Sequence, residues 1–214
     1  MRKTCRNHGV KEYWTARWED IPADSPMENM EVYPLKYSEM MVQDKKSRTL
    51  EAGCGAGRIL RYYHNHGYNI TGMDYIEVAI DKLKEIDPTI QVEVGDITSL
   101  KYSDQSFKYV LAFGLYHNLE DGLEKAIQET YRVLEKDGSV CASFRADNIQ
   151  TRLTDWLANR MTKARGEESK GEDFHKMNLT RCEYAKLFTD AGFLVEFVEA
   201  VENMPILYKF SIFR

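Results

Sequence analysis

From residue 48 onward, short apolar runs alternate with longer stretches in which apolar residues recur every three or four positions. The apolar runs predict strands at 48–52, 69–73, 90–94, 107–113 and 139–144. The periodic stretches predict helices at 58–66, 75–86, 120–134 and 180–191. Thr180 and Glu183 have capping-box spacing at the start of the last helix. Two final stretches, 193–201 and 206–213, predict a closing antiparallel pair.

This alternation predicts an α/β, doubly wound fold. Continuous apolar strands are typical of a mostly parallel sheet that is covered on both faces by helices. Right-handed crossovers then bring the carboxyl ends of the parallel strands to one edge of the sheet, where such folds bind their ligands. The segments expected at that edge are 53–57, Asp74, Asp96 and 113–118.

Residues 1–46 differ from the regular part at 47–214. They hold three of the five prolines and a group of aromatic residues, namely Tyr13, Trp14, Trp18, Tyr33 and Tyr37. We expect an N-terminal arm with a short helix near 35–42, laid over the domain that follows. A polar segment at about 147–178 is expected to be an insertion, in which Trp156, Leu157 and Met161 are spaced to pack on one helical face.

Composition narrows the class of protein. The 214 residues are 43% apolar, which suits one globular domain, and no run of about 18 apolar residues predicts a membrane span. The net charge of −5 disfavours a nucleic-acid partner. The four cysteines lie far apart without a CxxC pair, so we expect no metal site, no disulfide framework and a reduced, cytoplasmic setting.

The first strand runs into a glycine turn at 53–57 with the pattern G-x-G-x-G. Glycine lets the backbone adopt positive φ and approach a bound molecule closely. A dinucleotide would prefer a third glycine at position 58, which is Arg58. Glu51, just before the turn, would lie poorly beside a pyrophosphate but suits a cofactor with a free ammonium group. An NAD-dependent dehydrogenase is therefore the alternative, not the first choice.

Two acids follow at the ends of the next strands. Asp74 lies 21 residues after Gly53, where a carboxylate accepts hydrogen bonds from both ribose hydroxyls. Asp96 ends the third strand, where its carboxylate suits the amino group of adenine while Ile97 packs on the ring. Together these positions predict a site for an adenosine-bearing cofactor.

Five segments in this order resemble class I S-adenosylmethionine-dependent methyltransferases, most closely the small-molecule, type 11 methyltransferase domain. They are LEAGCGAGR at 50–58, GMDYI at 72–76, GDI at 95–97, FKYVLAFGLYHNL at 107–119 and VLEKDGS at 133–139. The resemblance covers 48 to about 145, and Ala-Gly-Phe at 191–193 matches a later part of the family. It implies a seven-stranded Rossmann-like sheet of order 3-2-1-4-5-7-6 with the last strand antiparallel.

The resemblance also implies S-adenosylmethionine as cofactor, with S-adenosylhomocysteine as its product. The implied cofactor residues are Glu51, Gly53, Cys54, Gly55, Gly57, Asp74, Tyr75, Ile76, Asp96, Ile97, Phe113 and Gly114. Glu51 and the glycine turn would hold the methionine moiety, Asp74 the ribose, and Tyr75 and Ile76 the adenine flanks. Phe113 and Gly114 would lie beside the methionine part of the cofactor.

His117 is the candidate general base, because it follows the fourth strand and histidine titrates near working pH. The alternative is a histidine that hydrogen-bonds the loop and shapes the pocket. Tyr116 is a second catalytic candidate, and Asn118 is a weaker one. His175, in the insertion, either faces the substrate or has an exposed or packing role.

The arm residues Tyr13, Trp14, Arg17 and Trp18 have two interpretations. They either anchor the arm on the domain or form a lid over cofactor and substrate, and both roles are compatible because a lid excludes water. In the lid, Arg17 is placed to meet an acidic group of the substrate.

The leading prediction is methyl transfer to a small-molecule acceptor by a monomer or homodimer. A methyltransferase acting on a protein or nucleic acid is an alternative, although base-amino methyltransferases usually need an Asn/Asp-Pro-Pro-aromatic loop and the loop at 113–118 has no proline. A regulatory module that binds the cofactor without turnover is another, because the glycine and acidic positions report binding alone. No motif identifies the accepting atom.

Overall fold

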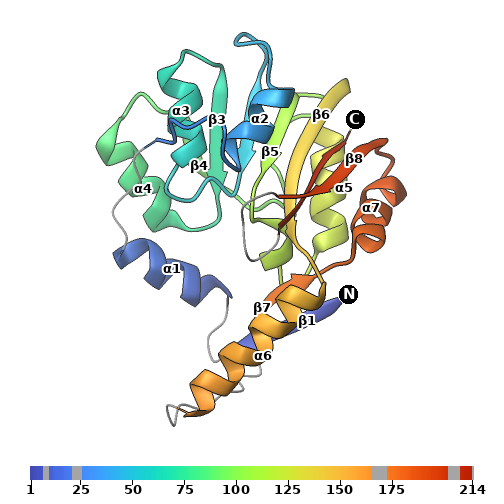
Figure 1. The fold of residues 1–214 in the computed structure, drawn as a ribbon. Helices are drawn as coiled ribbons and strands as arrows, with labels where there is room; N and C mark the ends of the chain where they lie inside the picture. Colours follow the sequence, from blue (N-terminus) through green and yellow to red (C-terminus); the bar gives the residue numbers. More distant parts are fainter. Residues whose placement is uncertain (7–9, 21–25, 165–172, 202–207, 214) are drawn as a thin grey trace.

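The computed structural model describes residues 1–6, 10–20, 26–164, 173–201 and 208–213. At its centre lies a seven-stranded sheet in the order β4-β3-β2-β5-β6-β9-β8 (Figure 1). Its strands are β2 (Thr49–Ala52), β3 (Ile70–Asp74), β4 (Val92–Val94), β5 (Phe107–Ala112), β6 (Leu134–Arg145), β8 (Val195–Ala200) and β9 (Tyr208–Phe213). The five neighbours from β4 to β6 pair in parallel, and β9 is antiparallel to both β6 and β8.

Numbered within the sheet from β2, this order reads 3-2-1-4-5-7-6. The predicted Rossmann-like fold, with a mostly parallel central sheet between helices, is confirmed. The helices that cover the sheet are α2 (Leu35–Met41), α3 (Arg58–Asn65), α4 (Glu77–Ile86), α5 (Leu123–Val133) and α7 (Arg181–Asp190).

Alternate strand residues point to opposite faces of the sheet and enter two buried clusters. Val110 and Val140 belong to one cluster, which α5 and α7 complete. Leu111 and Cys141 belong to the other, which α2, α3 and α4 complete. The sheet is thus the middle of three layers, and burial on both faces explains why its strands read as continuous apolar runs.

The predicted elements are present with shifted ends. The capping box of α7 is formed, since Thr180 accepts from the Glu183 backbone N–H while the Glu183 carboxylate accepts from the Thr180 N–H. The helix expected at 120–134 begins only at Leu123, after Gly122 with a φ of +74°. The strand expected at 139–144 reaches back to Leu134, because the pairing with β5 resumes beyond an irregularity next to Phe107.

The beginning of the chain contains two elements that the sequence pattern did not predict, β1 (Arg2–Arg6) and α1 (Val10–Asp20). Strand β1 pairs antiparallel with β7 (Asp173–Asn178), from the segment expected to be an insertion. The two segments thus form one ribbon although they are far apart in the chain. The residues of β1 are mostly polar, so no alternation of apolar and polar residues predicted this strand.

A buried polar network holds this ribbon to the end of β6. Arg145 is 4% exposed and donates to both carboxylate oxygens of Asp155, at 2.7 and 3.0 Å, and to the side chain of Asn178. Arg2 donates to Asp155 at 2.8 Å and to Asp147 at 2.9 Å. Because a buried guanidinium needs a partner, this network fixes the position of β1 and β7 relative to the sheet.

The interpretation of Trp156, Leu157 and Met161 as packing residues is wrong. They lie on α6 (Ile149–Ala164) and are 51%, 46% and 58% exposed. The helix projects away from the sheet (Figure 1), and its described contacts with the rest of the chain lie near its start, where Thr151 is fully buried and Asp155 bonds to Arg145. Among the helices that the structure describes, none is long and apolar enough to cross a membrane.

Candidate functional site

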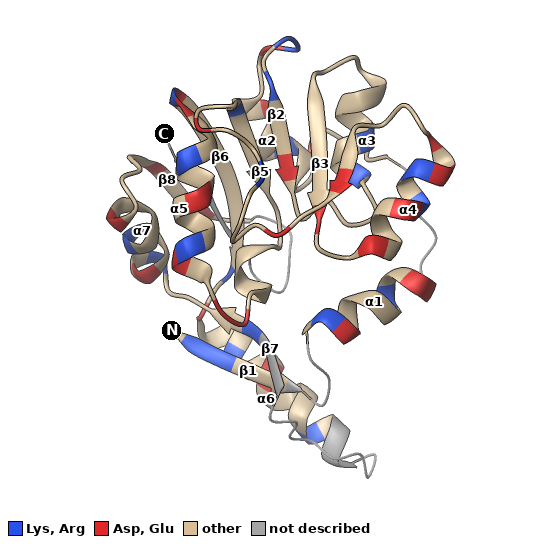
Figure 2. Cartoon of the chain, turned by 180° about the vertical axis from the view of Figure 1, so that it is seen from behind, with Lys and Arg blue, Asp and Glu red and all other residues tan. Residues whose placement is uncertain are grey.

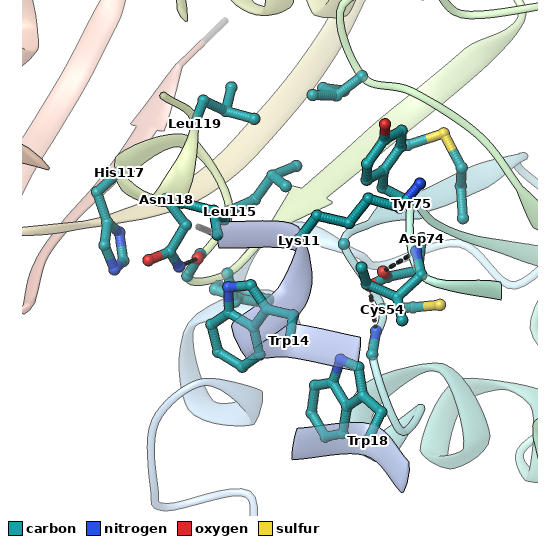
Figure 3. A pocket seen from close by; sticks show the side chains of 18 of the residues that line it. Lys11, Trp14, Trp18, Cys54, Asp74, Tyr75, Leu115, His117, Asn118 and Leu119 are labelled. Atoms are coloured by element: carbon teal, nitrogen blue, oxygen red, sulfur yellow. Dashed lines mark hydrogen bonds between the residues drawn. The ribbon is translucent and has the colours of Figure 1, made fainter. Parts of the chain in front are cut away.

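A cavity of about 1050 Å³ lies at the carboxyl ends of β2, β3 and β5, with α1 forming one wall (Figure 3). All twelve residues predicted to bind the cofactor line this cavity. Acidic residues mark the ends of β2 and β3 (Figure 2), and these are Glu51 and Asp74. The structure therefore brings together residues that are up to 63 positions apart in the sequence, from Glu51 to Gly114.

The glycine turn forms the floor of the cavity. Gly53, Gly55 and Gly57 have φ values of +72°, +49° and +76°, which side-chain-bearing residues rarely adopt. A Cβ on Gly55 would lie 2.7 Å from a ring carbon of Trp18. The turn therefore needs glycine for its backbone shape, and at position 55 also for the close approach of α1.

Glu51 is a buried acid facing the cavity. Its side chain is 4% exposed, and within the described part of the chain its Oε2 atom has no hydrogen-bond partner. Burial raises the pKa of this carboxyl to about 8, and the charge of Asp74 acts in the same direction. A ligand ammonium beside Glu51 would satisfy the oxygen and stabilise its charge, so this residue fits the amino-acid end of S-adenosylmethionine.

Asp74 links the glycine turn to the next strand. Its carboxylate accepts the N–H of Gly55 at 2.8 Å and the N–H of Ile76 at 2.9 Å. Burial nevertheless raises its pKa, because the loss of solvent outweighs these bonds. A carboxylate has about four acceptor sites, so two backbone bonds leave capacity for ribose hydroxyls.

The part of the cavity where adenine is expected has apolar walls and an acidic edge. Ile76 and Ile97 are buried, whereas Tyr75 is half-exposed with the Lys11 ammonium 4.7 Å from its ring centre. Asp96 accepts two bonds from Thr98, from the backbone N–H and the hydroxyl, both at 2.8 Å. This turn orients the Asp96 carboxylate at the rim of the cavity.

After β5, the chain enters a short helical turn, η1 (Tyr116–Asn118), that separates the two catalytic candidates. His117 and Asn118 line the cavity (Figure 3). Tyr116 is fully buried in the core, where its hydroxyl lies 2.7 Å from Thr130 Oγ1. The assignment of Tyr116 to catalysis is therefore wrong, because successive residues of a helical turn point in different directions.

The four arm residues lie together on α1. Tyr13, Trp14, Arg17 and Trp18 all line the cavity, and the rings of Trp14 and Trp18 stack at 5.6 Å (Figure 3). Helix α1 has no buried residue and is held to α4 by Lys82, which donates to the backbone carbonyls of Trp18 and Glu19. It therefore forms a wall of the cavity while contributing no buried residue to the core.

Sequence reasoning missed several lining residues, and Tyr33 and Lys176 are two of them. Tyr33 was noted as part of an aromatic arm, but nothing in the pattern indicated where its side chain lies. Lys176 reaches the cavity because β7 pairs with β1 beside η1, a pairing with no local signal. The backbone of His175 belongs to β7, but its side chain lies outside the described residues.

Comparisons with known proteins agree with this geometry. Residues 50–142 match the model of a methyltransferase domain family. A probable S-adenosylmethionine-dependent methyltransferase of Mycolicibacterium smegmatis is 27% identical over 147 residues, which is 69% of this chain and 52% of the relative. The chain spans only about half the length of that curated relative.

Two solved structures share the fold. A methyltransferase from Methanosarcina mazei superimposes with a TM-score of 0.67 at 23% identity, covering 85% of this chain and 97% of that one. A Burkholderia thailandensis 1,6-didemethyltoxoflavin N1-methyltransferase, solved with its acceptor and S-adenosylhomocysteine, gives 0.59 at 18% identity, covering 79% and 71%.

Fold and site thus define the class of protein: a Rossmann-like fold shared with solved S-adenosylmethionine-dependent methyltransferases, with a cavity at the carboxyl ends of its parallel strands. Within that fold, residues 50–142, a little under half of the chain, are the part that matches the methyltransferase domain model. This match agrees with the resemblance that the motifs carry.

Proposed function

We propose that this chain transfers the methyl group of S-adenosylmethionine to a small-molecule nucleophile. The observation that carries the proposal is the buried Glu51 carboxylate, which faces the cavity beside the glycine turn with an oxygen that has no partner among the described residues. A cationic amino group is the natural complement of such an acid, and S-adenosylmethionine carries one. An NAD cofactor would bring a pyrophosphate to this place instead.

In this proposal each wall of the cavity has one task. Glu51 holds the ammonium group, Asp74 holds the ribose hydroxyls, and Ile76 and Ile97 enclose the adenine. S-adenosylmethionine supplies an activated methyl group when it is bound. The protein then aligns the acceptor and excludes water, and positioning of this kind is worth roughly 7–11 kcal/mol in favourable cases.

His117 is the residue proposed to take a proton from the acceptor. It is 3% exposed, lines the cavity beside Asn118, and has the ring of Phe144 at 6.2 Å. A neutral imidazole nitrogen accepts a proton near working pH. The loop that carries it is held by bonds to Gly114, so the ring has a defined place relative to the end of β5.

Replacing His117 with alanine is expected to lower kcat by about 10²-fold, the usual range for a positioned base, while the dissociation constant for S-adenosylmethionine stays within about twofold. Transfer of a labelled methyl group and calorimetry measure the two quantities. His64→Ala, at the far end of α3, is the control. Equal turnover of the His117 variant at saturating acceptor would refute the base role.

We also propose that α1 acts as a lid. Trp18 lies directly on the glycine turn, and Trp14 continues the aromatic wall toward η1. Deleting residues 1–30 would be an ambiguous test, because it also removes the β1 strand that pairs with β7. A point variant in α1 isolates the lid.

Trp18→Ala is expected to raise the dissociation rate of S-adenosylmethionine by about fivefold to tenfold, because one aromatic wall is lost. Stopped-flow fluorescence measures this rate. Trp156→Ala, on the exposed α6, is a matched control for losing a tryptophan. Trp156→Ala should release the cofactor at the parent rate. The lid proposal fails if Trp18→Ala does so too.

The small-molecule acceptor rests on two observations. The cavity is walled by α1 and the η1 turn, and a solved relative in fold carries its small acceptor together with the cofactor product. Incubating the chain with S-adenosylmethionine labelled in the methyl group and a metabolite extract tests the proposal directly. Label in a small molecule supports the proposal. Label in protein or nucleic acid favours a methyltransferase that acts on a macromolecule, and binding without transfer favours a regulatory module.

A further inference from the structure

The side chain of Tyr33 connects the arm to the loop that carries His117. Its hydroxyl lies 2.7 Å from Ser143 Oγ on β6. Ser143 Oγ also accepts the backbone N–H of Gly114 at 2.9 Å. Ser143 is fully buried, so this hydroxyl is shielded from water and held between its two partners. Two consecutive hydrogen bonds therefore run from Tyr33 to the backbone of Gly114.

Gly114 needs these partners because it lies beyond the paired part of β5. The ladder between β5 and β6 ends at Ala112 opposite Ala142. The Gly114 N–H is bonded to Ser143, and its carbonyl accepts from the side-chain amide of Asn118. With a φ of +73°, Gly114 is the point at which the chain turns out of the sheet. Side-chain bonds at both ends of this residue thus set the direction of the following turn.

The ring of Tyr33 is also held. It meets Phe113 edge to face at 5.9 Å and Tyr37 at 6.4 Å. Tyr37 is 4% exposed and Leu35 is fully buried, so α2 anchors this segment in the core. Tyr33 and Phe113 both line the cavity. A rigid element therefore presents the phenol to the end of β5.

We infer that Tyr33 is a positioning residue for methyl transfer: through Ser143 its hydroxyl fixes the Gly114 peptide, and thereby the placement of His117 against the acceptor. This role rests on the function proposed above. It assigns the arm a task besides covering the cavity, because the arm also sets the geometry of the loop that faces the acceptor. The relay has a testable signature, since Tyr33 and Ser143 act on the same peptide.

The test compares Tyr33→Phe, Ser143→Ala and the double variant of the full chain. Tyr33→Phe keeps the ring and removes the hydroxyl, and Tyr131→Phe, at a half-exposed site on α5, is the matched control. Each variant is saturated with methyl-labelled S-adenosylmethionine and mixed with the metabolite extract, and the single-turnover rate of transfer is recorded. Hydrogen exchange of the Gly114 amide is followed by NMR, and the dissociation constant of S-adenosylhomocysteine by calorimetry.

Each single variant is expected to transfer the methyl group about tenfold more slowly than the parent, because the reacting groups are displaced. The double variant is expected to be no slower than Ser143→Ala, because both residues act on the same peptide. The Gly114 amide should exchange faster in all three. The dissociation constant of S-adenosylhomocysteine should change by less than about threefold, because the bonds to Glu51 and Asp74 are untouched. Tyr131→Phe should match the parent throughout.

Parent-like transfer and parent-like Gly114 exchange in Tyr33→Phe would overturn the inference. A hydroxyl with a purely structural role would lower the melting temperature without changing the transfer rate, and independent effects would multiply in the double variant. A parent chain that binds no S-adenosylmethionine would instead overturn the proposed function. The Gly114 amide would then still report whether the relay exists, so the two failures are distinguishable.

Discussion

Replacing Glu51 with glutamine is expected to weaken binding of S-adenosylmethionine by about 10- to 100-fold, the loss typical of a charge-assisted hydrogen bond. The same variant should leave binding of adenosine unchanged, because adenosine has no ammonium group. Calorimetry with both ligands measures the difference. A variant that loses affinity for both ligands alike would point to a collapsed turn, and one that loses neither would refute the ammonium assignment.

The raised pKa of Glu51 predicts a second measurable effect, the release of a proton when the cofactor binds. With a pKa of about 8, the carboxyl is protonated at pH 7 until an ammonium group arrives, so binding should release close to one proton. Titrations in two buffers of different ionisation enthalpy count that proton. The parent should release it at pH 7 but not at pH 9.5, and Glu51→Gln should release none at either pH.

The same shift predicts how stability depends on pH. The pKa of Glu51 is higher in the folded chain than its ordinary value of 4.5, so its contribution to stability is fully present below pH 4.5. That contribution is lost as the pH rises through about 8. Without cofactor, Glu51→Gln should therefore be more stable than the parent above pH 8, by a few kcal/mol. Denaturant unfolding at pH 5 and pH 9 measures it, and equal stability at both values would contradict the burial argument.

Replacing Asp74 with alanine is expected to cost about 1.5–3 kcal/mol of cofactor binding, because it removes a charged acceptor of the ribose hydroxyls. The loss should be equal for S-adenosylmethionine and adenosine, which share the ribose. This pattern is the opposite of the one expected for Glu51, so the two variants together assign the two ends of the cofactor. Asp74 also accepts the N–H of Gly55, and the turn is expected to loosen in its absence.

Asp81→Asn, on the exposed side of α4, is the matched control for the loss of a carboxylate. It should bind both ligands as the parent does. An Asp74 variant with parent affinity for adenosine would refute the ribose assignment, whatever its effect on S-adenosylmethionine.

Much of the part of the cavity expected to hold the cofactor was predictable, because each of its residues belongs to a recognisable local sequence pattern. A strand end, a glycine turn and an acid at the next strand end follow one another in the chain, and parallel pairing brings such ends to one edge. Glu51, Gly55 and Asp74 meet in the cavity for this reason. Their roles remain predictions that the experiments above address.

The acceptor side was less predictable because it depends on contacts between distant segments. Tyr116 and His117 are neighbours in sequence, and only the orientation of η1 sends one into the core and the other to the cavity. Trp156 has helical spacing, but a helix face packs only where another element covers it. Within the described chain no element covers this face of α6, and Trp156 is therefore exposed. A periodic pattern predicts a helix face without saying what covers it.

The sequence by itself determined the doubly wound sheet, the edge at which the cavity lies and the acids that line it, because these follow from local patterns and the handedness of crossovers. Only the tertiary structure decided that β1 pairs with β7, that Trp18 covers Gly55 and that Tyr33 reaches Gly114 through Ser143. Those contacts join residues at least 29 positions apart, and their energies come from burial and hydrogen bonds that exist only after the chain has folded.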